Sequence, residues 1–138
     1  MKISDLMYYG RYYRDENEVN HLWWFDLQNN KIYRYDTLLE EYGYESQEDI
    51  LNSNAFIPMF ETDILALEHV FVLKTQNKKV INFFDKISDT VFDKEFKIFV
   101  EKNFMTEPWH DFEKKQLYAD ALKWCKENQI IGITHGDV

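Results

Sequence analysis

The stretch that most constrains this fold is HLWWFDLQNNKIYRYD, residues 21–36. Two aromatic-rich runs flank the pair Asn29-Asn30, and runs of this kind favour β-strands. Asparagine tolerates the positive φ angle that a two-residue type I′ turn needs at both central positions. The stretch therefore predicts a β-hairpin that turns at Asn29-Asn30. Its expected cross-strand pairs are Leu27 with Ile32 and Trp24 with Tyr35.

A lone hairpin is only marginally stable in water, so further elements have to cover this one. The sequence FIPMF, residues 56–60, is a candidate third strand, because the residue before Pro58 is biased away from helix. Residues 37–55 are acidic and weakly periodic, which predicts a loop with one or two short helical turns. Residues 3–13 predict a short helix capped by Ser4 or, alternatively, an extended segment with alternating tyrosines.

Helical periodicity dominates the second half of the chain. Thr62 is the expected N-cap of one helix, and residues 77–87 predict a second. A third helix is expected to begin near Asp93. The last is expected to begin near Glu107-Pro108, because proline is tolerated in a first turn, and to end near Asn128.

Together these elements predict an α+β fold in which a small β-hairpin or sheet is covered by a mostly α-helical C-terminal half. Gly (four) and Pro (two) are scarce, which disfavours sandwiches and barrels with many tight turns. The length of 138 residues fits a single domain, 1–138, with the hairpin at about 21–36, helices at about 62–128 and a tail at 129–138. The side chains expected to be largely buried are Trp23, Phe25, Leu27, Ile32, Phe84, Phe96, Phe99, Trp109, Leu117 and Trp124.

The charge is unevenly distributed along the sequence. The formal net charge is −9, which disfavours nucleic acid and anionic membranes as partners and favours a basic protein. Residues 37–61 hold six acidic residues and no basic one. Acidic groups interspersed with aromatic rings predict a docking edge for a basic protein surface. Its predicted residues are Glu40, Glu41, Tyr42, Tyr44, Glu45, Glu48 and Asp49. The alternative is a solvated connecting loop whose charge only keeps the protein soluble.

The segment YYGRYYR, residues 8–14, interleaves tyrosine with arginine, as platforms for single-stranded nucleic acid do. Phosphate binding also needs a sustained positive groove, whereas Arg11 and Arg14 are followed by the acidic run DENE. The tyrosines are therefore interpreted as amphipathic cover of the core with hydroxyl groups at its rim.

Motifs for metals, cofactors and catalysis are missing from the sequence. No histidine or cysteine has the spacing of a zinc site, and the aspartates at 85, 89 and 93 do not fit a calcium loop. The four histidines, His21, His69, His110 and His135, are isolated from one another. The four glycines cannot form a phosphate-binding loop or a dinucleotide fingerprint. We therefore expect no catalytic residue, no metal site and no cofactor.

The single cysteine, Cys125, cannot form an internal disulfide and is interpreted as a small buried hydrophobic residue. The N-terminal residues lack the apolar region of a signal peptide. No stretch approaches about 18 uninterrupted apolar residues, so no transmembrane helix is expected. These features predict a cytoplasmic location.

Five segments resemble a known family in their order and pattern: WFDLQNNKIYRYD, FIPMF, LEHVFVL, FDKEFKIFVEKNF and EPWHDFEKKQLYADALKWCKENQI. Spanning roughly residues 21–130, they are similar to the bacterial uncharacterised protein family 0158. That family carries a hairpin similar to YLDLETGEV, an Ile-Pro element and a helical half that closes with Trp-x-x-Phe and Ala-x-x-Trp patterns. Trp109, Phe112, Ala121 and Trp124 stand in those places here. The turn departs from the family, since Asn29-Asn30 replaces the usual Thr-Gly.

The family has no established activity, so the resemblance implies a bacterial cytoplasmic α+β domain and transfers no catalytic residue. We expect a small acidic, non-enzymatic protein-interaction module. One alternative is an inhibitor or immunity-type protein for a basic toxin, because small size, acidity and abundant Tyr and Trp suit a tight interface. The other is an unrecognised enzyme, whose acid–base groups would be Glu40, Glu41, Asp49, His110 and Asp111.

Overall fold

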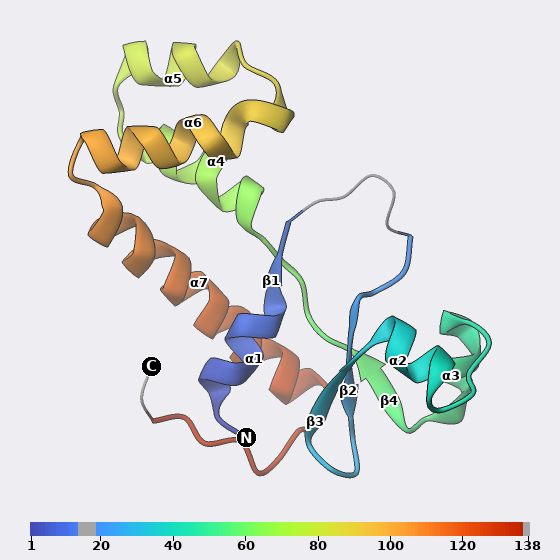
Figure 1. Ribbon diagram of the computed structural model, residues 1–138. Coiled ribbons are helices and arrows are strands. Elements are labelled where there is room, and N and C mark those ends of the chain that lie inside the picture. Colours follow the sequence, from blue (N-terminus) through green and yellow to red (C-terminus); the bar gives the residue numbers. More distant parts are fainter. Residues whose placement is uncertain (14–18, 137–138) are drawn as a thin grey trace.

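The computed structural model describes residues 1–13 and 19–136 (Figure 1). Its fold is α+β, as expected, with a three-stranded antiparallel sheet, a short parallel strand pair and a helical C-terminal half. The described elements are α1 (Ile3–Gly10), β1 (Arg11–Tyr12), β2 (Trp23–Asp26), β3 (Lys31–Arg34), α2 (Tyr35–Glu40), α3 (Gln47–Ser53), β4 (Phe56–Pro58), β5 (Thr62–Asp63), α4 (Ile64–Lys74), α5 (Lys78–Asp85), α6 (Asp89–Lys102) and α7 (Thr106–Glu127).

The predicted hairpin is confirmed, but its turn and register are not as expected. β2 and β3 pair Phe25 with Ile32, so four residues, 27–30, connect the strands instead of two. The carboxylate of Asp26 accepts hydrogen bonds from the backbone N–H groups of Gln28 (2.9 Å) and Asn29 (3.1 Å), which stabilises this wider turn. Only Asn30 of the two asparagines has a positive φ, 52°. Leu27 consequently lies in the turn and is 39% exposed, which contradicts its expected place in the core.

The expected third strand is confirmed. β4 pairs antiparallel with β2 and places Pro58 opposite Trp24, giving the strand order β3-β2-β4. Proline fits there because β4 is an edge strand, where a missing backbone donor is tolerated.

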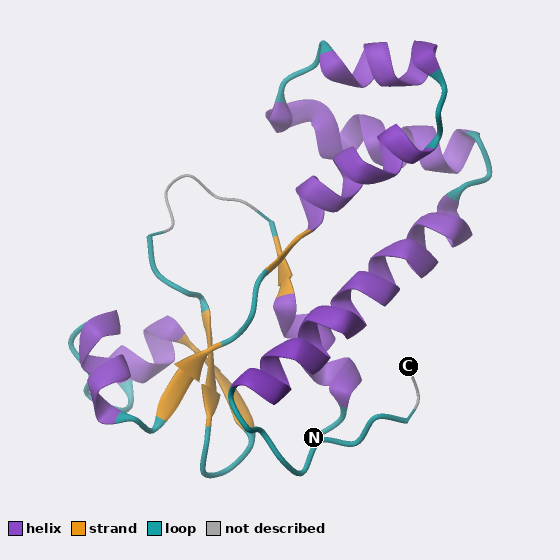
Figure 2. Ribbon diagram, turned by 180° about the vertical axis from the view of Figure 1, so that it is seen from behind, coloured by secondary structure: helices purple, strands orange, loops and turns teal. Residues whose placement is uncertain are grey.

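The two faces of the sheet are covered by different helices, because successive side chains of β2 point to opposite faces. Phe25 packs in a core with Leu6 of α1 and Trp124 of α7, whereas Trp24 packs with Leu38 of α2 and Ile50 of α3. Viewed from behind, Figure 2 shows α2 and α3 on the opposite side of the sheet from α7. Residues 37–55, which predicted a loop with one or two short helical turns, thus contain most of α2 and all of α3, and both helices pack on the sheet.

The N-terminal segment combines both of its predicted conformations. α1 ends at Gly10, and the chain then becomes the strand β1, which pairs in parallel with β5. The N-cap is Lys2 and not Ser4, and the Asp5 carboxylate accepts a hydrogen bond from the Lys2 backbone N–H (3.1 Å). Gly10 is required by packing, since a Cβ atom there would lie 2.1 Å from the ring of Phe60. The sequence RDENEVN, residues 14–20, predicts a polar connection, and most of it lies outside the described residues.

A helical lobe, defined as α4, α5, α6 and the first half of α7, has its own core. Phe92, Phe96 and Val100 of α6 share one buried face, which confirms the helical spacing of the phenylalanines. Two of these helices begin at other residues than expected. Asp63, not Thr62, caps α4, and α6 begins at Asp89, four residues before Asp93. α7 has 22 residues, about 33 Å, and joins this lobe to α1 and the sheet (Figures 1 and 2).

Most of the predicted core is confirmed. The buried members are Phe25, Phe84, Phe96, Trp109, Leu117 and Trp124. Trp23, Ile32 and Phe99 are only half-buried and pack against the edges of these cores. The predicted tail is not separate from the fold, because Ile3 donates a backbone hydrogen bond to Thr134 (2.8 Å) and Thr134 donates one to Met1 (3.1 Å).

Candidate functional site

The predicted docking residues gather around the junction of α2 and α3, and we call this set the acidic edge: Glu40, Glu41, Tyr42, Tyr44, Glu45, Glu48 and Asp49. α2 and α3 lie together at one end of the molecule (Figure 1). All five carboxylate residues are exposed, and none of the four glutamates forms an ion pair with another described residue. The fold therefore leaves the negative charge of this segment available to solvent.

An aromatic cluster centred on Phe56 of β4 stabilises the acidic edge. The buried ring of Phe56 lies with its centroid 5.9 Å from that of Tyr33, 5.8 Å from Tyr42 and 5.9 Å from Tyr44. Tyr42 is 48% exposed, so it presents part of its ring among the glutamates. A hydrogen bond with the Tyr33 side chain, followed by desolvation, raises the pKa of Tyr42, and the charges of Asp26 and Glu41 add to this effect.

Asp49 also has a structural role that distinguishes it from the glutamates. Its carboxylate accepts a hydrogen bond from the backbone N–H of Glu45 (3.0 Å), while its own N–H donates to the Ser46 hydroxyl (3.2 Å). These bonds close the first turn of α3 and fix the loop that carries Tyr44 and Glu45. Asp49 therefore holds the shape of the acidic edge.

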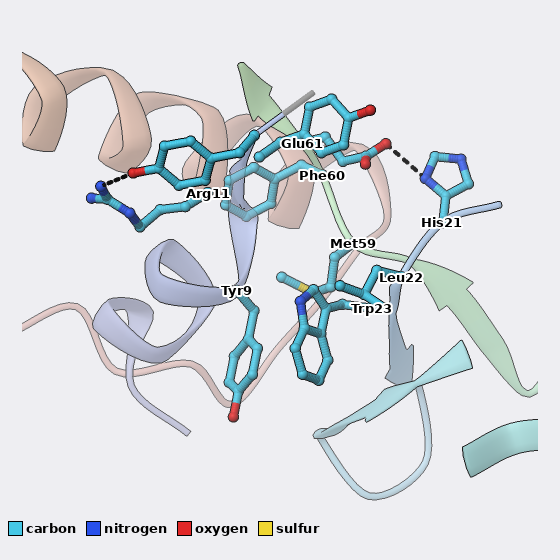
Figure 3. Close-up of a pocket in the computed structure, with 10 residues that line it drawn as sticks. Tyr9, Arg11, His21, Leu22, Trp23, Met59, Phe60 and Glu61 are labelled. Carbon is cyan, nitrogen blue, oxygen red and sulfur yellow. Dashed lines mark hydrogen bonds and ion pairs between the residues drawn. The ribbon is translucent and has the colours of Figure 1, made fainter. Parts of the chain in front are cut away.

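An aromatic pocket of about 190 Å³ lies between α1, the start of β2 and the β4–β5 connection (Figure 3). Its lining includes the charged or titratable side chains of Arg11, His21 and Glu61. The other lining residues are aromatic or apolar: Tyr9, Tyr12, Tyr13, Leu22, Trp23, Met59 and Phe60. Nδ1 of His21 lies 2.9 Å from the Glu61 carboxylate, and its backbone N–H donates to the Gln47 side chain of α3 (2.8 Å). His21 thus connects the pocket to the first turn of α3.

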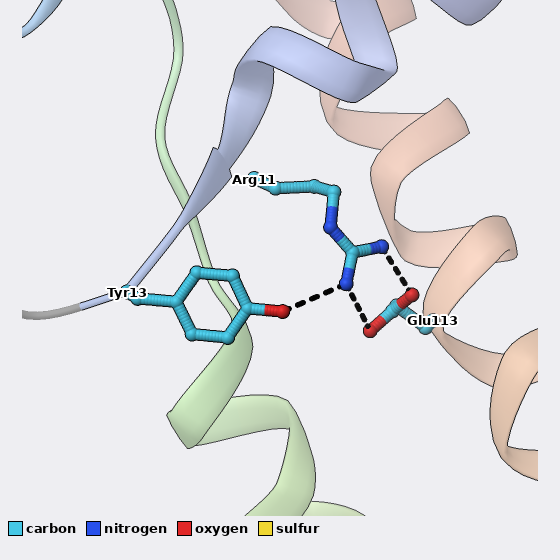
Figure 4. Close-up of polar contacts among 3 residues, drawn as sticks. All are labelled: Arg11, Tyr13 and Glu113. Atoms are coloured by element: carbon cyan, nitrogen blue, oxygen red, sulfur yellow. Dashed lines mark hydrogen bonds and ion pairs between the residues drawn. The ribbon is translucent and has the colours of Figure 1, made fainter. Parts of the chain in front are cut away.

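A second cavity, of about 490 Å³, lies between β1, α4, α6 and α7, and we call it the interlobe cavity. Arg11 forms a two-pronged ion pair there with Glu113 and also donates to the Tyr13 hydroxyl at 2.8 Å (Figure 4). Arg11 and Glu113 are 102 positions apart in the sequence. Arg11 is therefore held by a carboxylate of α7.

Two further carboxyl groups meet beside this cavity. Glu68 of α4 is 1% exposed and is hydrogen-bonded through its side chain to Asp93 of α6. A bond between two carboxyl groups requires a proton, and burial together with Asp93 raises the pKa of Glu68 to about 9. The hydrogen bond from Glu68 lowers the pKa of Asp93, and so does Lys97, whose Nζ lies 3.0 Å from the Asp93 carboxylate. Glu68 therefore carries the shared proton at neutral pH.

The sequence patterns did not single out Glu68 or Glu113, although a signal was present. Glu68 lies between Ile64 and Val72 at spacings of four, and Glu113 lies between Trp109 and Leu117 in the same way. A charged residue at a position of the buried helical face indicates a pairing partner elsewhere.

The structure does not bring the candidate acid–base groups of an enzyme together. Among them only His110 lines the interlobe cavity, whereas Glu40, Glu41 and Asp49 lie on α2 and α3, and Asp111 is exposed on α7. Two histidines expected to be isolated have partners: His21 pairs with Glu61, and His69 stacks on the Phe92 ring with centroids 3.8 Å apart. Cys125 is buried, as expected, and burial raises the pKa of its thiol.

Comparisons with known proteins do not identify a family for this chain. No family model, no curated protein and no solved structure matches the chain. The resemblance to uncharacterised protein family 0158 therefore stays a hypothesis. Within residues 1–13 and 19–136, no helix is both long and apolar enough to cross a membrane, and no cluster of three or more His, Cys, Asp or Glu could hold a metal ion.

Proposed function

We propose that the protein is a non-enzymatic interaction module that docks a basic segment of a partner protein on its acidic edge. The observation that carries this proposal is the exposure of Glu40, Glu41, Glu45 and Glu48 around the partly exposed ring of Tyr42, without a described cation to neutralise them. Like charges held together on a surface attract a basic partner and accelerate encounter, while rings supply buried contact area.

The aromatic pocket specifies the partner further. His21 connects it to α3 through the bond with Gln47, and Glu61 adds a carboxylate to its lining. Its volume of about 190 Å³ accommodates one large apolar side chain. A fitting segment therefore carries several lysines or arginines and one aromatic anchor, the residue type that dominates binding energy at interfaces.

The test uses a synthetic peptide that contains lysines, arginines and one tryptophan, and follows its association with the full chain by stopped-flow fluorescence. The triple variant Glu40→Gln, Glu41→Gln, Glu45→Gln should associate about tenfold more slowly at low salt and show a shallower salt dependence. Its free energy of unfolding should change by no more than about 0.5 kcal/mol, because the three side chains are exposed.

A matched control changes three exposed acidic residues of the helical lobe, Asp85→Asn, Glu107→Gln and Asp111→Asn, and so alters net charge equally. This variant should retain most of the wild-type association rate. Equal slowing by both triple variants would show that only net charge matters, and no slowing by the first would remove the acidic edge as the docking surface. Replacing the peptide's tryptophan with serine tests the pocket separately, through the dissociation rate.

A further inference from the structure

The interlobe cavity contains a buried acid that the docking proposal does not use. Glu68 lines the cavity and is 1% exposed, and its Oε1 atom accepts no hydrogen bond from a described N–H or O–H donor. Oδ1 of Asp93, its neighbour on α6, is also buried, and it has no described donor other than the proton shared with Glu68. Two buried carboxyl groups in contact need a positive charge between or beside their oxygens, and a proton is the smallest cation that can supply it.

The described cations that line the cavity already form ion pairs. From β1, Arg11 is bound to Glu113 of α7, and from α6, Lys97 is bound to Asp93. Glu101 of α6 adds another carboxylate at the exposed side, and His110 of α7 is the remaining titratable group of the lining besides Tyr13. Among the described residues, and counting Asp93, three ionised carboxylates and the protonated Glu68 thus face two fixed cations, which leaves a net negative charge for a further cation to balance.

The walls of the cavity favour an organic cation over a metal ion. Trp109 and Val100 supply apolar surface, and Trp109 and Tyr13 present rings that attract ammonium and guanidinium groups. The cavity of about 490 Å³ exceeds the room that a bare ion needs. Within the described residues, no group of three or more potential ligands is arranged to hold a metal ion.

We propose that the interlobe cavity binds a small organic cation whose ammonium or guanidinium group pairs with Glu68 and whose carbon chain lies against Val100 and Trp109. The cation takes over the role of the proton shared by Glu68 and Asp93, so that binding releases a proton to solvent. This site is on different elements from the acidic edge and does not depend on the docking function.

The experiment is isothermal titration calorimetry of the full chain with n-butylammonium, 1,4-diaminobutane and n-butylguanidinium, with n-butanol as the uncharged probe. Titrations at pH 7 in two buffers of different ionisation enthalpy give the number of protons released. We expect binding of at least one cation, no binding of n-butanol, and release of close to one proton per bound ligand, because Glu68 is protonated beforehand.

The variant Glu68→Gln retains the shape of the protonated acid and should weaken binding by at least about tenfold, with no proton release. The control Glu107→Gln removes an exposed carboxylate outside the cavity and should leave both quantities unchanged. Circular dichroism confirms that each variant is folded. Absence of binding by all three cations, binding without proton release, or equal binding by Glu68→Gln would each overturn the proposal. If Glu68→Gln fails to fold, the decision rests on proton release by the wild type.

Discussion

Phe96 is completely buried, and its ring lies against those of Phe71, Phe84 and Trp109 at centroid distances of 5.9, 6.4 and 4.7 Å. Replacing Phe96 with Ala should lower the free energy of unfolding by about 3–5 kcal/mol, because it removes many contacts and leaves a cavity. Phe99 is half-buried and contacts mainly the edge of this core, so Phe99→Ala should cost about half as much. Urea denaturation of both variants measures the difference, and equal losses would contradict this ranking.

Glu68 makes stability depend on pH in a defined direction. Its pKa is about 9 in the fold and 4.5 without the fold's influence. The folded state therefore binds the proton more tightly, so the stabilisation is complete below pH 4.5 and is lost as the pH rises toward 9. Glu68→Gln cannot lose a proton, and its stability relative to wild type should increase by up to about 1.4 kcal/mol per pH unit between these values. Urea denaturation at several pH values tests this, and a constant difference would contradict it.

At the scale of elements, the hairpin depends on the side chain of Asp26. This carboxylate is 6% exposed and accepts three hydrogen bonds from the turn, including one from the Asn29 side chain at 2.9 Å. Asp26→Ala should destabilise the protein by about 2–3 kcal/mol and speed hydrogen exchange in the turn, because two backbone donors lose their partner. Asn29→Ala removes only one of the bonds and should cost about 1 kcal/mol or less. A reversed order of the two losses would show that the turn is stabilised by other contacts.

For the whole molecule, the ion pair of Arg11 and Glu113 ties β1 to α7, beside the helical lobe. The Glu113 side chain is 9% exposed and that of Arg11 is 31% exposed. Arg11→Leu should lower stability by about 2–3 kcal/mol, because it leaves a buried carboxylate unpaired. The double variant Arg11→Leu, Glu113→Leu should recover most of this loss, since an apolar pair avoids the desolvation cost of two charges.

An exposed pair on α7 provides the comparison for this ion pair. Nζ of Lys123 lies 3.9 Å from the Glu127 carboxylate, and both side chains are mostly exposed. Lys123→Leu should change the free energy of unfolding by no more than about 0.5 kcal/mol. Thermal or urea unfolding of these three variants and the wild type measures the effects, and equal losses for the Arg11 and Lys123 substitutions would contradict the buried-pair interpretation.

Local patterns in the sequence predicted most of the elements. The aromatic runs predicted β2 and β3, Pro58 predicted an extended β4, and apolar residues spaced three and four apart predicted the helices of the second half. Each of these signals acts through near neighbours in the chain: turn chemistry, a restricted φ angle, or the face of a helix. The exposure of the acidic edge was predictable for the same reason, because a run of uncompensated carboxylates is costly to bury.

Tertiary structure decided the features that depend on distant residues. The register of the hairpin follows from the bonds of Asp26 with the turn and from β4 on the other side of β2, whereas the Asn-Asn pair alone favoured a shorter turn. The pairing of Glu68 with Asp93, and of Glu113 with Arg11, could not be predicted because a charged residue on a buried helical face does not specify its partner. Only folding brings these groups within hydrogen-bonding distance and removes the water that would otherwise solvate them, which sets their protonation and creates the interlobe cavity.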